Sequence, residues 1–251
     1  NPNNKSLLTF RDNMDTEGSS WIPLINDKGN QTFFLQGDSV KVGDFAWRAD
    51  APVTETDQVL LFFDPLIKVS GAKPVMRFWH NYNTEGGADA GFVEFQKAGE
   101  SQWRRIAAEK GIRAGYNNKI AYGTFAIPFI SGFSGNSNGW VRSYIDVSEY
   151  SNQEIIFRFR FGSDAAINVP DGGWIVDQVD LMDMVNYESE ACVTADGGDL
   201  ACAKAPESGV IVDTDATKGR IGENAGHNRA EDTADAVDTE DVQGIIRAQH
   251  S

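Results

Sequence analysis

The acidic, glycine-rich stretch at residues 83–91, NTEGGADAG, contains the side chains best suited to bind a cation. It lies between two segments rich in aromatic and β-branched residues, so we expect it to connect two strands. Glu85 and Asp89 offer carboxylates, which calcium binds together with carbonyl oxygens and water. A solvated turn without a metal is the alternative, because acidic glycine-rich turns also occur without ions. The sequence leaves both interpretations open.

Histidine is the side chain that acts most often as a general base, and the chain has three of them. His80 lies in MRFWHNY, where strand alternation places it on one face with Met76, Phe78 and Tyr82. We therefore predict a hydrogen-bonded core or rim histidine at this position. The motifs HExxH, GxSxG and GxxxxGK[ST] do not occur, and we expect no catalytic residue in this chain.

Asp177 is the carboxylate with the most unusual surroundings. In WIVDQVDL, alternation places it on the same face as Ile175, Val179 and Leu181, which is the more apolar face and so the one expected to turn toward the core. An ionised carboxylate in such a position needs a cation, an arginine or several hydrogen-bond donors, because removing it from water is costly. We predict a structural calcium ion at Asp177. The alternative is a hydrogen-bonded carboxylate that is satisfied by backbone N–H groups or by Arg77 or Arg48.

Strands are the elements that would position these side chains. Runs rich in Val, Ile, Phe, Tyr and Trp alternate with Gly, Asn, Ser and Pro, and no long segment repeats every 3.6 residues. We expect strands at residues 58–69, 74–82, 90–98, 103–109, 140–147, 154–163 and 173–184. The pattern predicts an all-β fold, namely an antiparallel jelly-roll β-sandwich with an acidic, largely irregular C-terminal tail.

The segment EIIFRFRFGS shows the clearest alternation in the chain. Phe157, Phe159 and Phe161 occupy one face of the expected strand, whereas Arg158 and Arg160 occupy the other. This pattern is typical of a half-buried strand. We expect the two arginines to be solvated or paired with nearby acidic residues.

Charge and aromatic content divide the chain into two parts. The net charge is −15, and residues 188–251 contribute 14 Asp and Glu against 5 Lys and Arg, with no Phe, Trp or Tyr. We therefore predict a β-sandwich domain at residues 1–187 and an acidic tail or linker at residues 188–251. Within the tail, a short helix is expected at residues 238–249, with an additional strand pair as the alternative.

Composition also limits partners and location. An acidic chain without a basic stripe is a poor partner for nucleic acid, and no apolar run reaches the ~18 residues of a membrane span. Cys192 and Cys202 flank a Gly–Gly turn, so we predict one local disulfide, with two free thiols as the alternative. A disulfide favours an oxidising compartment, and we expect a secreted, extracellular protein. The start NPNNKS lacks a signal-peptide pattern, which we interpret as a piece of a longer precursor.

Four segments together resemble a known family. They are FRDNMDTEGSSW, the run from FAWRADAP to DAGFVEFQ, FSGNSNGWVRSYIDVSEYSNQEIIFRFRFGSD, and GGWIVDQVDL. Their order over about residues 8–187 resembles the jelly-roll accessory domains of secreted bacterial metallopeptidases of the fungalysin and immune inhibitor A types, and more distantly MAM domains. The resemblance implies a non-catalytic β-sandwich that binds protein or glycan, or that supports the catalytic domain of the parent enzyme.

The same resemblance implies a metal near Asp177, held with acids from the first strand and a connecting loop. In this sequence Glu17, Asp15 and Asp50 are the positions that match. The family pattern GWYIDDI has two adjacent acids, whereas here Gln178 follows Asp177. This difference weakens any metal site that needs both carboxylates.

A calcium-dependent carbohydrate-binding module is the second interpretation. It requires exposed aromatic rings as a platform for sugar rings, and the candidates are Trp47, Trp79, Tyr116 and Trp140. Packing within strands is the competing role for Trp79 and Trp140. A stand-alone jelly-roll glycosidase is the third interpretation, because two carboxylates across a cleft suffice for its acid and base.

Overall fold

The computed structural model describes residues 8–16, 20–26, 28–120, 129–167, 169–187, 190–194, 200–204 and 208–210. The chain divides into two compact units, one formed by Leu8–Asp183 and the other by Asn1–Leu7 together with Met184–Ser251. Glu17 and the helix expected at residues 238–249 lie outside the described residues. The predicted domain boundary at residue 187 stays a prediction.

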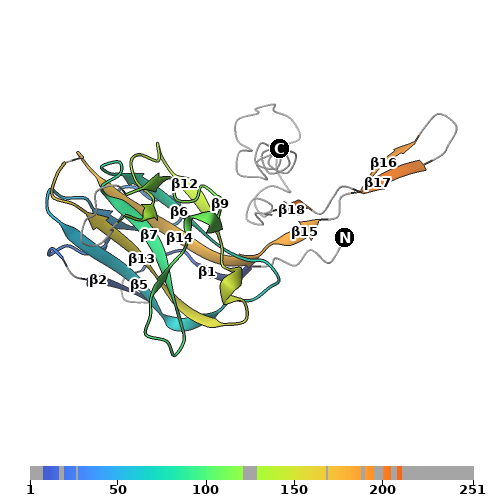
Figure 1. Cartoon of the computed structure of the whole chain (residues 1–251), viewed down its shortest axis with the longest axis horizontal. Coiled ribbons are helices and arrows are strands. Elements are labelled where there is room, and N and C mark those ends of the chain that lie inside the picture. The colour runs from blue at the N-terminus through green and yellow to red at the C-terminus, as the bar shows by residue number, and fades with distance from the viewer. Residues whose placement is uncertain are drawn as a thin grey trace. The chain divides into compact units, whose positions relative to one another are not determined.

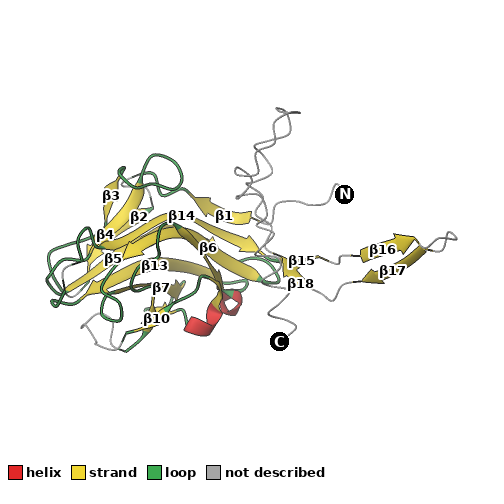
Figure 2. Ribbon diagram, turned by 90° about the horizontal axis from the view of Figure 1, so that it is seen from above, coloured by secondary structure: helices red, strands yellow, loops and turns green. Residues whose placement is uncertain are grey.

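Two antiparallel sheets form the unit Leu8–Asp183, and they appear as two layers in Figures 1 and 2. Sheet A has seven strands in the order β3-β4-β14-β6-β12-β9, with β1 also paired to β14. These strands are β1 (Leu8–Asp12), β3 (Phe34–Gln36), β4 (Ala46–Asp50), β6 (Pro74–Asn83), β9 (Gly111–Arg113), β12 (Val141–Asp146) and β14 (Gly173–Asp183). Sheet B has five strands in the order β2-β5-β13-β7-β8. These strands are β2 (Trp21–Ile25), β5 (Thr56–Lys68), β7 (Ala90–Lys97), β8 (Arg104–Arg105) and β13 (Glu154–Ser163).

The connectivity identifies the sandwich as a jelly roll. From β4 to β7, and again from β12 to β14, successive strands alternate between the two sheets. The resulting order places β4-β14-β6-β12 in one layer and β5-β13-β7-β8 in the other, which is the arrangement of two Greek keys folded together. The prediction of an all-β jelly-roll sandwich is confirmed.

The expected strands correspond closely to β5, β6, β7, β12, β13 and β14. The strand expected at residues 103–109 is wrong over most of its length, because that segment contains only the two-residue β8 and the start of a 3-10 helix, Ala108–Lys110. The remaining small elements are a second 3-10 helix, Ser148–Tyr150, and the pair β10 (Asn118–Lys119) and β11 (Ser131–Gly132). Among the described residues, no helix has the length and apolar character needed to cross a membrane.

Aromatic side chains from both sheets fill the space between the layers. Phe157, Phe159 and Phe161 of β13 are all buried in the main core, as their alternation predicts. Phe159 packs edge-on against Phe78 of sheet A, with 5.0 Å between ring centroids, and against Trp174, with 5.7 Å. These contacts join the two sheets and leave the intervening arginines on the outer face of sheet B.

A β-bulge in β14 reverses its alternation. Trp174 and Val176 face the core before the bulge, and Val179 and Leu181 face it afterwards. The register to β6 shifts between Asp177 and Val179, and Gln178 takes a φ of 31°. On the opposite edge of β14, the pairing with β4 ends at Val176 and the pairing with β1 begins at Val179. The bulge therefore lies where two partner strands meet.

The second unit contains two short strand pairs. β15 (Val185–Tyr187) pairs with β18 (Ser208–Val210), and β16 (Glu190–Thr194) pairs with β17 (Leu200–Lys204). Cys192 is directly opposite Cys202 in the register of β16 and β17. Opposed residues of an antiparallel pair have Cα atoms roughly 4.5–5.5 Å apart, within the span of a disulfide. The backbone is thus compatible with the disulfide, which stays a prediction.

Candidate functional site

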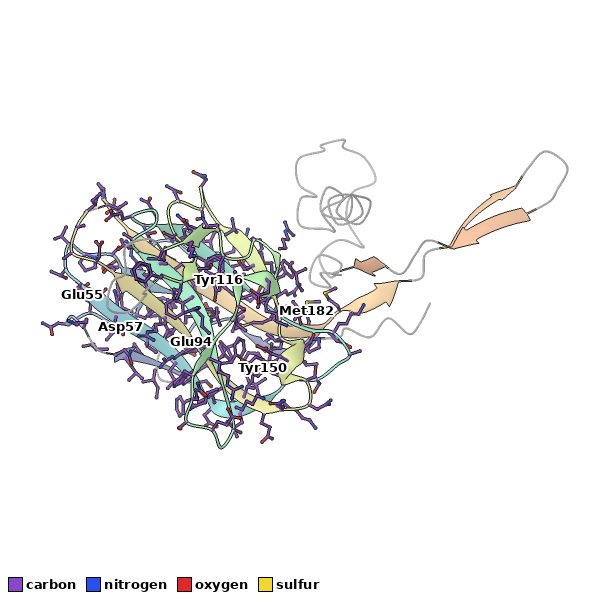
Figure 3. The ribbon with its side chains drawn as sticks, viewed as in Figure 1. Glu55, Asp57, Glu94, Tyr116, Tyr150 and Met182 are labelled. Atoms are coloured by element: carbon purple, nitrogen blue, oxygen red, sulfur yellow. The ribbon has the colours of Figure 1, made fainter. Side chains whose placement is uncertain are left out.

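A row of ion-paired side chains crosses the outer face of sheet B. Arg160 of β13 donates from Nε and Nη2 to the two carboxylate oxygens of Asp57, at 2.8 and 2.7 Å. Arg158 donates from Nε to Glu94 of β7. A longer contact of 3.6 Å links Arg160 Nη1 to the other oxygen of Glu94. Asp57 and Glu94 lie on the two strands that flank β13, so the row spans three adjacent strands (Figure 3).

Aromatic rings border this row on the side of β7 and β8. The guanidinium carbon of Arg158 lies 4.2 Å from the centroid of the half-buried Trp103 ring. The guanidinium carbons of Arg160 and Arg105 lie 5.7 and 5.9 Å from the Phe92 ring. We call these residues the sheet B face. It consists of Asp57, Phe92, Glu94, Trp103, Arg105, Arg158 and Arg160, of which Asp57, Phe92 and Glu94 are buried and Arg105 is exposed.

The side chains of the row are ion-paired and largely shielded from solvent. The exposed fractions are 12% for Arg158, 15% for Arg160, 9% for Glu94 and 0% for Asp57. Burial lowers the pKa of Arg158 from its usual value, and the Glu94 carboxylate opposes that shift. Each charge of this row is therefore paired, and none of its four side chains is an isolated buried ion.

Sequence reasoning placed Arg158 and Arg160 on an outer face but missed the other members of the sheet B face. Asp57, Glu94 and Trp103 come from segments far apart in sequence, and only the register of β5, β13 and β7 brings the acids beside the arginines. The sequence did contain one indication of Glu94. In GFVEFQK, Glu94 shares a strand face with Phe92 and Gln96, whereas the apolar Val93 and Phe95 occupy the opposite face.

Three carboxylates meet in the loops at one end of the sandwich. Glu85 and Asp89 belong to the connection between β6 and β7, as expected from the acidic stretch, and Asp164 follows β13. One ligand oxygen from each carboxylate lies within 4.8 Å of the others. The sequence did not single out Asp164, because its position depends on β13 ending beside β7. We call these three residues the acidic loop cluster.

Asp89 is the most constrained member of this cluster. It is 2% exposed, and its oxygens accept hydrogen bonds from the backbone N–H groups of Asp164, at 2.9 Å, and Glu85, at 3.3 Å. Burial raises the pKa of Asp89 to about 6, and the neighbouring carboxylates of Asp164 and Glu85 add to the increase. A divalent cation would relieve this repulsion, and carboxylate oxygens are ligands that calcium prefers.

Asp177 is fully buried, but it does not face the core. The bulge at Gln178 places it on the outer side of sheet A, and this corrects the expectation from simple alternation. Its Oδ2 accepts from the N–H groups of Lys41 and Val42, at 2.7 and 2.9 Å, and its Oδ1 accepts from that of Gln178. Burial raises the pKa of Asp177, and these hydrogen bonds lower it. The contacts match the alternative of backbone N–H donors.

The other acids expected near Asp177 have separate roles. Asp15 accepts hydrogen bonds from the N–H groups of Asp44 and Phe45, so it anchors the same 41–45 segment. Asp50 pairs with Arg48 at 2.6 Å. Among the described residues, Asp15, Asp50 and Asp177 do not form a three-carboxylate group. A cation at Asp177 stays untested, and Glu17 lies outside the described residues.

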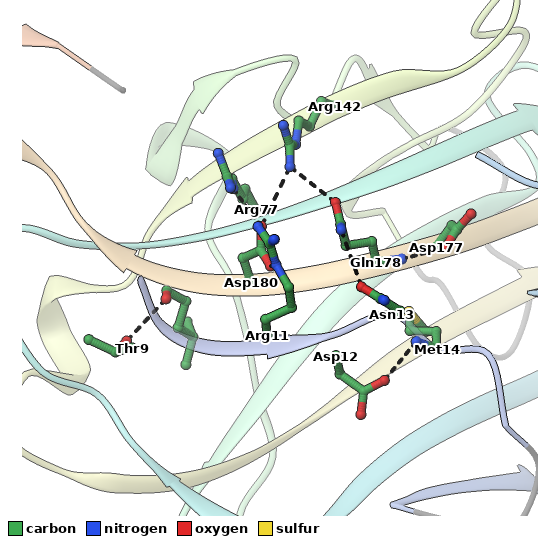
Figure 4. Close-up of polar contacts among 11 residues, drawn as sticks. Thr9, Arg11, Asp12, Asn13, Met14, Arg77, Arg142, Asp177, Gln178 and Asp180 are labelled. Atoms are coloured by element: carbon green, nitrogen blue, oxygen red, sulfur yellow. Dashed lines mark hydrogen bonds and ion pairs between the residues drawn. The ribbon is translucent and has the colours of Figure 1, made fainter. Parts of the chain in front are cut away.

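A buried arginine cluster on the outer face of sheet A was not anticipated. Asp180 of β14 is 0% exposed and accepts from Arg11 of β1, at 2.8 Å, and Arg77 of β6, at 2.7 Å (Figure 4). Arg142 of β12 approaches the same carboxylate at 3.5 Å and also donates to Gln178. Arginines from three strands thus contact one carboxylate on a fourth strand, which we interpret as a contact that helps to fix the relative positions of β1, β6, β12 and β14.

His80 is a core histidine, as its strand position predicts. It is 0% exposed, and burial lowers its pKa to about 3. Its Nδ1 lies 3.1 Å from Nε1 of Trp174, and its Nε2 lies 2.7 Å from Oγ of Ser143. Both partners are buried, so this serine and histidine are closed to a substrate.

The four aromatic residues expected to form a platform do not come together as one surface. Trp47 is 0% exposed and belongs to the main core, which corrects its assignment as a ligand platform. Trp79 is half-buried, with Lys41 Nζ at 4.4 Å and Arg142 Cζ at 5.0 Å from its ring. The hydroxyl of Tyr116 accepts from Val93 N–H at 2.9 Å, which ties that ring to β7. Trp140 is half-buried and stays an untested candidate.

Comparisons with known proteins give only distant matches in fold. No protein-family model matches the chain, and a search of curated proteins finds no match. The xylan-binding CBM22-1 domain of Xyn10C from Paenibacillus barcinonensis is similar at 11% identity, covering 70% of this chain and 94% of that domain, with a TM-score of 0.41. The K1 cleaved adhesin domain of Lys-gingipain from Porphyromonas gingivalis W83 is similar at 13% identity. This match covers 69% of this chain and 97% of that domain, with a TM-score of 0.42.

A third match is TmCBM61, a carbohydrate-binding module solved with β-1,4-galactotriose, at 10% identity and a TM-score of 0.41, covering 66% of this chain and 90% of that one. At these identities and scores, the matches carry no conclusion about the ligand of this chain. The resemblance to metallopeptidase accessory domains gains no support from them either. A functional assignment therefore depends on the described side chains.

Proposed function

We propose that the unit Leu8–Asp183 is a non-catalytic, glycan-binding β-sandwich whose ligand site is the sheet B face. The observation that carries this proposal is the half-buried Trp103 ring held against Arg158, beside a row of paired charged groups on three strands. Aromatic rings stack on the apolar faces of sugars, and guanidinium groups donate hydrogen bonds to sugar oxygens. Because the ion pairs already orient these groups, a ligand need not pay to order them.

A non-catalytic role is supported by the surroundings of the groups that could do chemistry. His80 and Ser143 are buried and hydrogen-bonded to structural partners. Glu94 and Asp57 accept hydrogen bonds from Arg158 and Arg160, so these contacts already occupy their carboxylate oxygens. These contacts argue against the glycosidase interpretation for the sheet B face.

We propose calcium as the structural ion of the acidic loop cluster. Glu85, Asp89 and Asp164 supply three carboxylates from two loops at the same end of the sandwich. An ion there would hold the β6–β7 connection against the segment after β13, because both loops would share one centre. The role proposed for calcium is therefore to order these loops.

The accessory role in a secreted multidomain peptidase is the second candidate, and it is carried by the order of the four sequence segments described above. In that setting the module would bind a protein or glycan surface, or the catalytic domain itself. A secreted location belongs to the same proposal. The two candidates are compatible, because a glycan-binding module can also be part of a larger enzyme.

Binding of the full chain to a glycan array tests the main proposal. We expect binding to at least one polysaccharide class, and loss of about five- to tenfold in affinity for Trp103→Ala, because a stacked aromatic ring contributes about 1–1.5 kcal/mol. Trp140→Ala is the matched control, since Trp140 is also half-buried and, among the described residues, has no ring or cation–π contact with the sheet B face. Absence of binding to every glycan, or equal binding by Trp103→Ala, would contradict the proposal.

A further inference from the structure

Arg105 differs from the other arginines of the sheet B face. It lies in β8 opposite Glu94 of β7, and its side chain is exposed. Its guanidinium carbon is 5.9 Å from the Phe92 ring. Within the described part of the chain, its side chain has no ion pair or hydrogen bond. The adjacent Arg104 instead donates to Glu100 at 3.1 Å.

The two carboxylates of the face are already satisfied. Asp57 accepts two hydrogen bonds from Arg160 and a third from the Asn26 side chain at 2.7 Å. Glu94 accepts from Arg158. Arg105 therefore adds a positive charge next to completed ion pairs, although the whole chain has a net charge of −15. Salt screens interactions between exposed charges beyond about 8–10 Å, so the charge of Arg105 acts mainly on groups close to the face, and distant acidic residues affect such groups less.

Trp103 and Arg105 are two residues apart in an extended segment, so their side chains project to the same side. Their contacts support this orientation. Trp103 lies against Arg158 and Arg105 lies over Phe92, and Arg158 and Phe92 both belong to the sheet B face. A sugar ring stacked on Trp103 would thus have the guanidinium of Arg105 near its edge. In a uronic acid the carboxylate is attached directly to the ring, at that edge.

We infer that the ligand of the sheet B face is an acidic polysaccharide built from uronic acids. Arg105 binds the sugar carboxylate, and Trp103 stacks on the sugar ring. This inference rests on the proposed glycan-binding function and specifies its ligand class. A guanidinium suits a carboxylate because its planar donors pair with both oxygens, and Arg105, exposed and unpaired among the described residues, keeps those donors available.

The test compares polymers that differ only in charge. The full chain is titrated with galacturonan, alginate and glucuronoxylan, and with their carboxyl-reduced forms, in which each carboxylate has become an alcohol. We expect at least tenfold tighter binding to one acidic polymer than to its reduced form, and a weakening of that preference with added salt. Dextran sulfate and dextran form a second pair that separates a carboxylate from a sulfate.

Two variants test whether Arg105 causes the preference for the acidic polymer over its carboxyl-reduced form. Arg105→Gln should bind the acidic and reduced polymers equally, whereas Arg104→Gln should keep the preference, because the Arg104 charge is paired with Glu100. Both substitutions are at exposed positions, so the melting temperature should stay within about 1 °C of wild type.

The outcomes separate this inference from the proposed function. Equal binding of acidic and reduced polymers that is lost in Trp103→Ala overturns the uronate inference and leaves the glycan-binding proposal standing. Tighter binding to dextran sulfate than to every uronate also overturns the inference. Absence of binding to all of these polymers and to a neutral glycan array overturns both.

Discussion

The indole nitrogen of Trp174 lies 3.1 Å from Nδ1 of His80 and donates a hydrogen bond to it across strands β14 and β6. Because an indole N–H is only a donor, Nδ1 must be the acceptor and the ring proton must lie on Nε2. Nε2 then donates to Oγ of Ser143, which donates to the carbonyl of Ala114. The neutral ring is therefore fully hydrogen-bonded, and protonation would disrupt this chain of contacts.

We predict that acid destabilises the protein partly through His80. The folded pKa of about 3 is below the ordinary value of 6.5, so between these values the unfolded state binds a proton that the folded state does not. The contribution of neutral His80 is fully present above pH 6.5 and is lost as pH falls toward 3, by about 1.4 kcal/mol per pH unit at most. Urea unfolding at a series of pH values measures it.

His80→Gln serves as the comparison, because it removes the titrating group and keeps a hydrogen-bonding side chain. The difference in free energy of unfolding between wild type and variant should shrink as the pH falls. Other titrating groups contribute equally to both proteins and cancel in this difference. A difference that is constant from pH 7 to pH 4 would show that His80 does not titrate on unfolding.

Calcium should stabilise the protein more at pH 7.5 than at pH 5. The folded pKa of Asp89 is raised to about 6 from 3.8, so without an ion its ionisation makes folding less favourable as the pH rises through this window. A bound cation needs the ionised carboxylate, and its affinity therefore falls below pH 6. Melting with 5 mM calcium or with EDTA, at both pH values, measures the effect.

Asp89→Asn should abolish the response to calcium, and it should be as stable as wild type or more stable in EDTA at pH 7.5, because it removes the repulsion. Asp38→Asn is the matched control, since Asp38 is an exposed carboxylate outside the acidic loop cluster. An equal response to calcium in wild type and Asp89→Asn would place the ion elsewhere.

We expect Asp177→Asn to lower the free energy of unfolding by about 1–3 kcal/mol, because one of the oxygens that accepts backbone N–H bonds is replaced by a donor. Denaturant unfolding in EDTA checks the value. If Asp177 is held by N–H donors alone, the loss should be the same with and without calcium. A loss that appears only when calcium is present would instead identify Asp177 as an ion ligand.

The Cys192–Cys202 disulfide is expected to form in oxidised protein. Mass spectrometry of unreduced peptides should show the two cysteines linked, as the opposed positions in β16 and β17 allow. Reduction should leave the melting temperature of the unit Leu8–Asp183 within about 2 °C, because the bond closes a short loop in the other unit. Recovery of both cysteines as free thiols from native protein would contradict the pairing.

The sequence by itself was enough to predict, for the regular strands, which side chains face the core and which face outward. Alternation in EIIFRFRFGS assigned Phe157 and Phe159 to the core and Arg158 to the outer face, and the structure agrees. This works because a strand repeats every two residues, so each side chain's face follows from its neighbours. The same rule placed His80 in the core.

The rule failed where the backbone departs from regular pleating. Gln178 is an extra residue in β14, and from that point the faces are exchanged, so Asp177 lies on the outer side although its apolar neighbours suggested the core. The residues of WIVDQVDL do not indicate the bulge, because it forms where β4 and β1 meet along the edge of β14.

Only the tertiary structure decided which distant side chains meet. Register brings Glu94 to Arg158, and the end of β13 brings Asp164 to Asp89. The position of β8 at the edge of sheet B places Trp103 against Arg158. Local sequence specifies the face of a residue through the period of its own strand, whereas a partner is set by strand order and register, which depend on packing of the entire core.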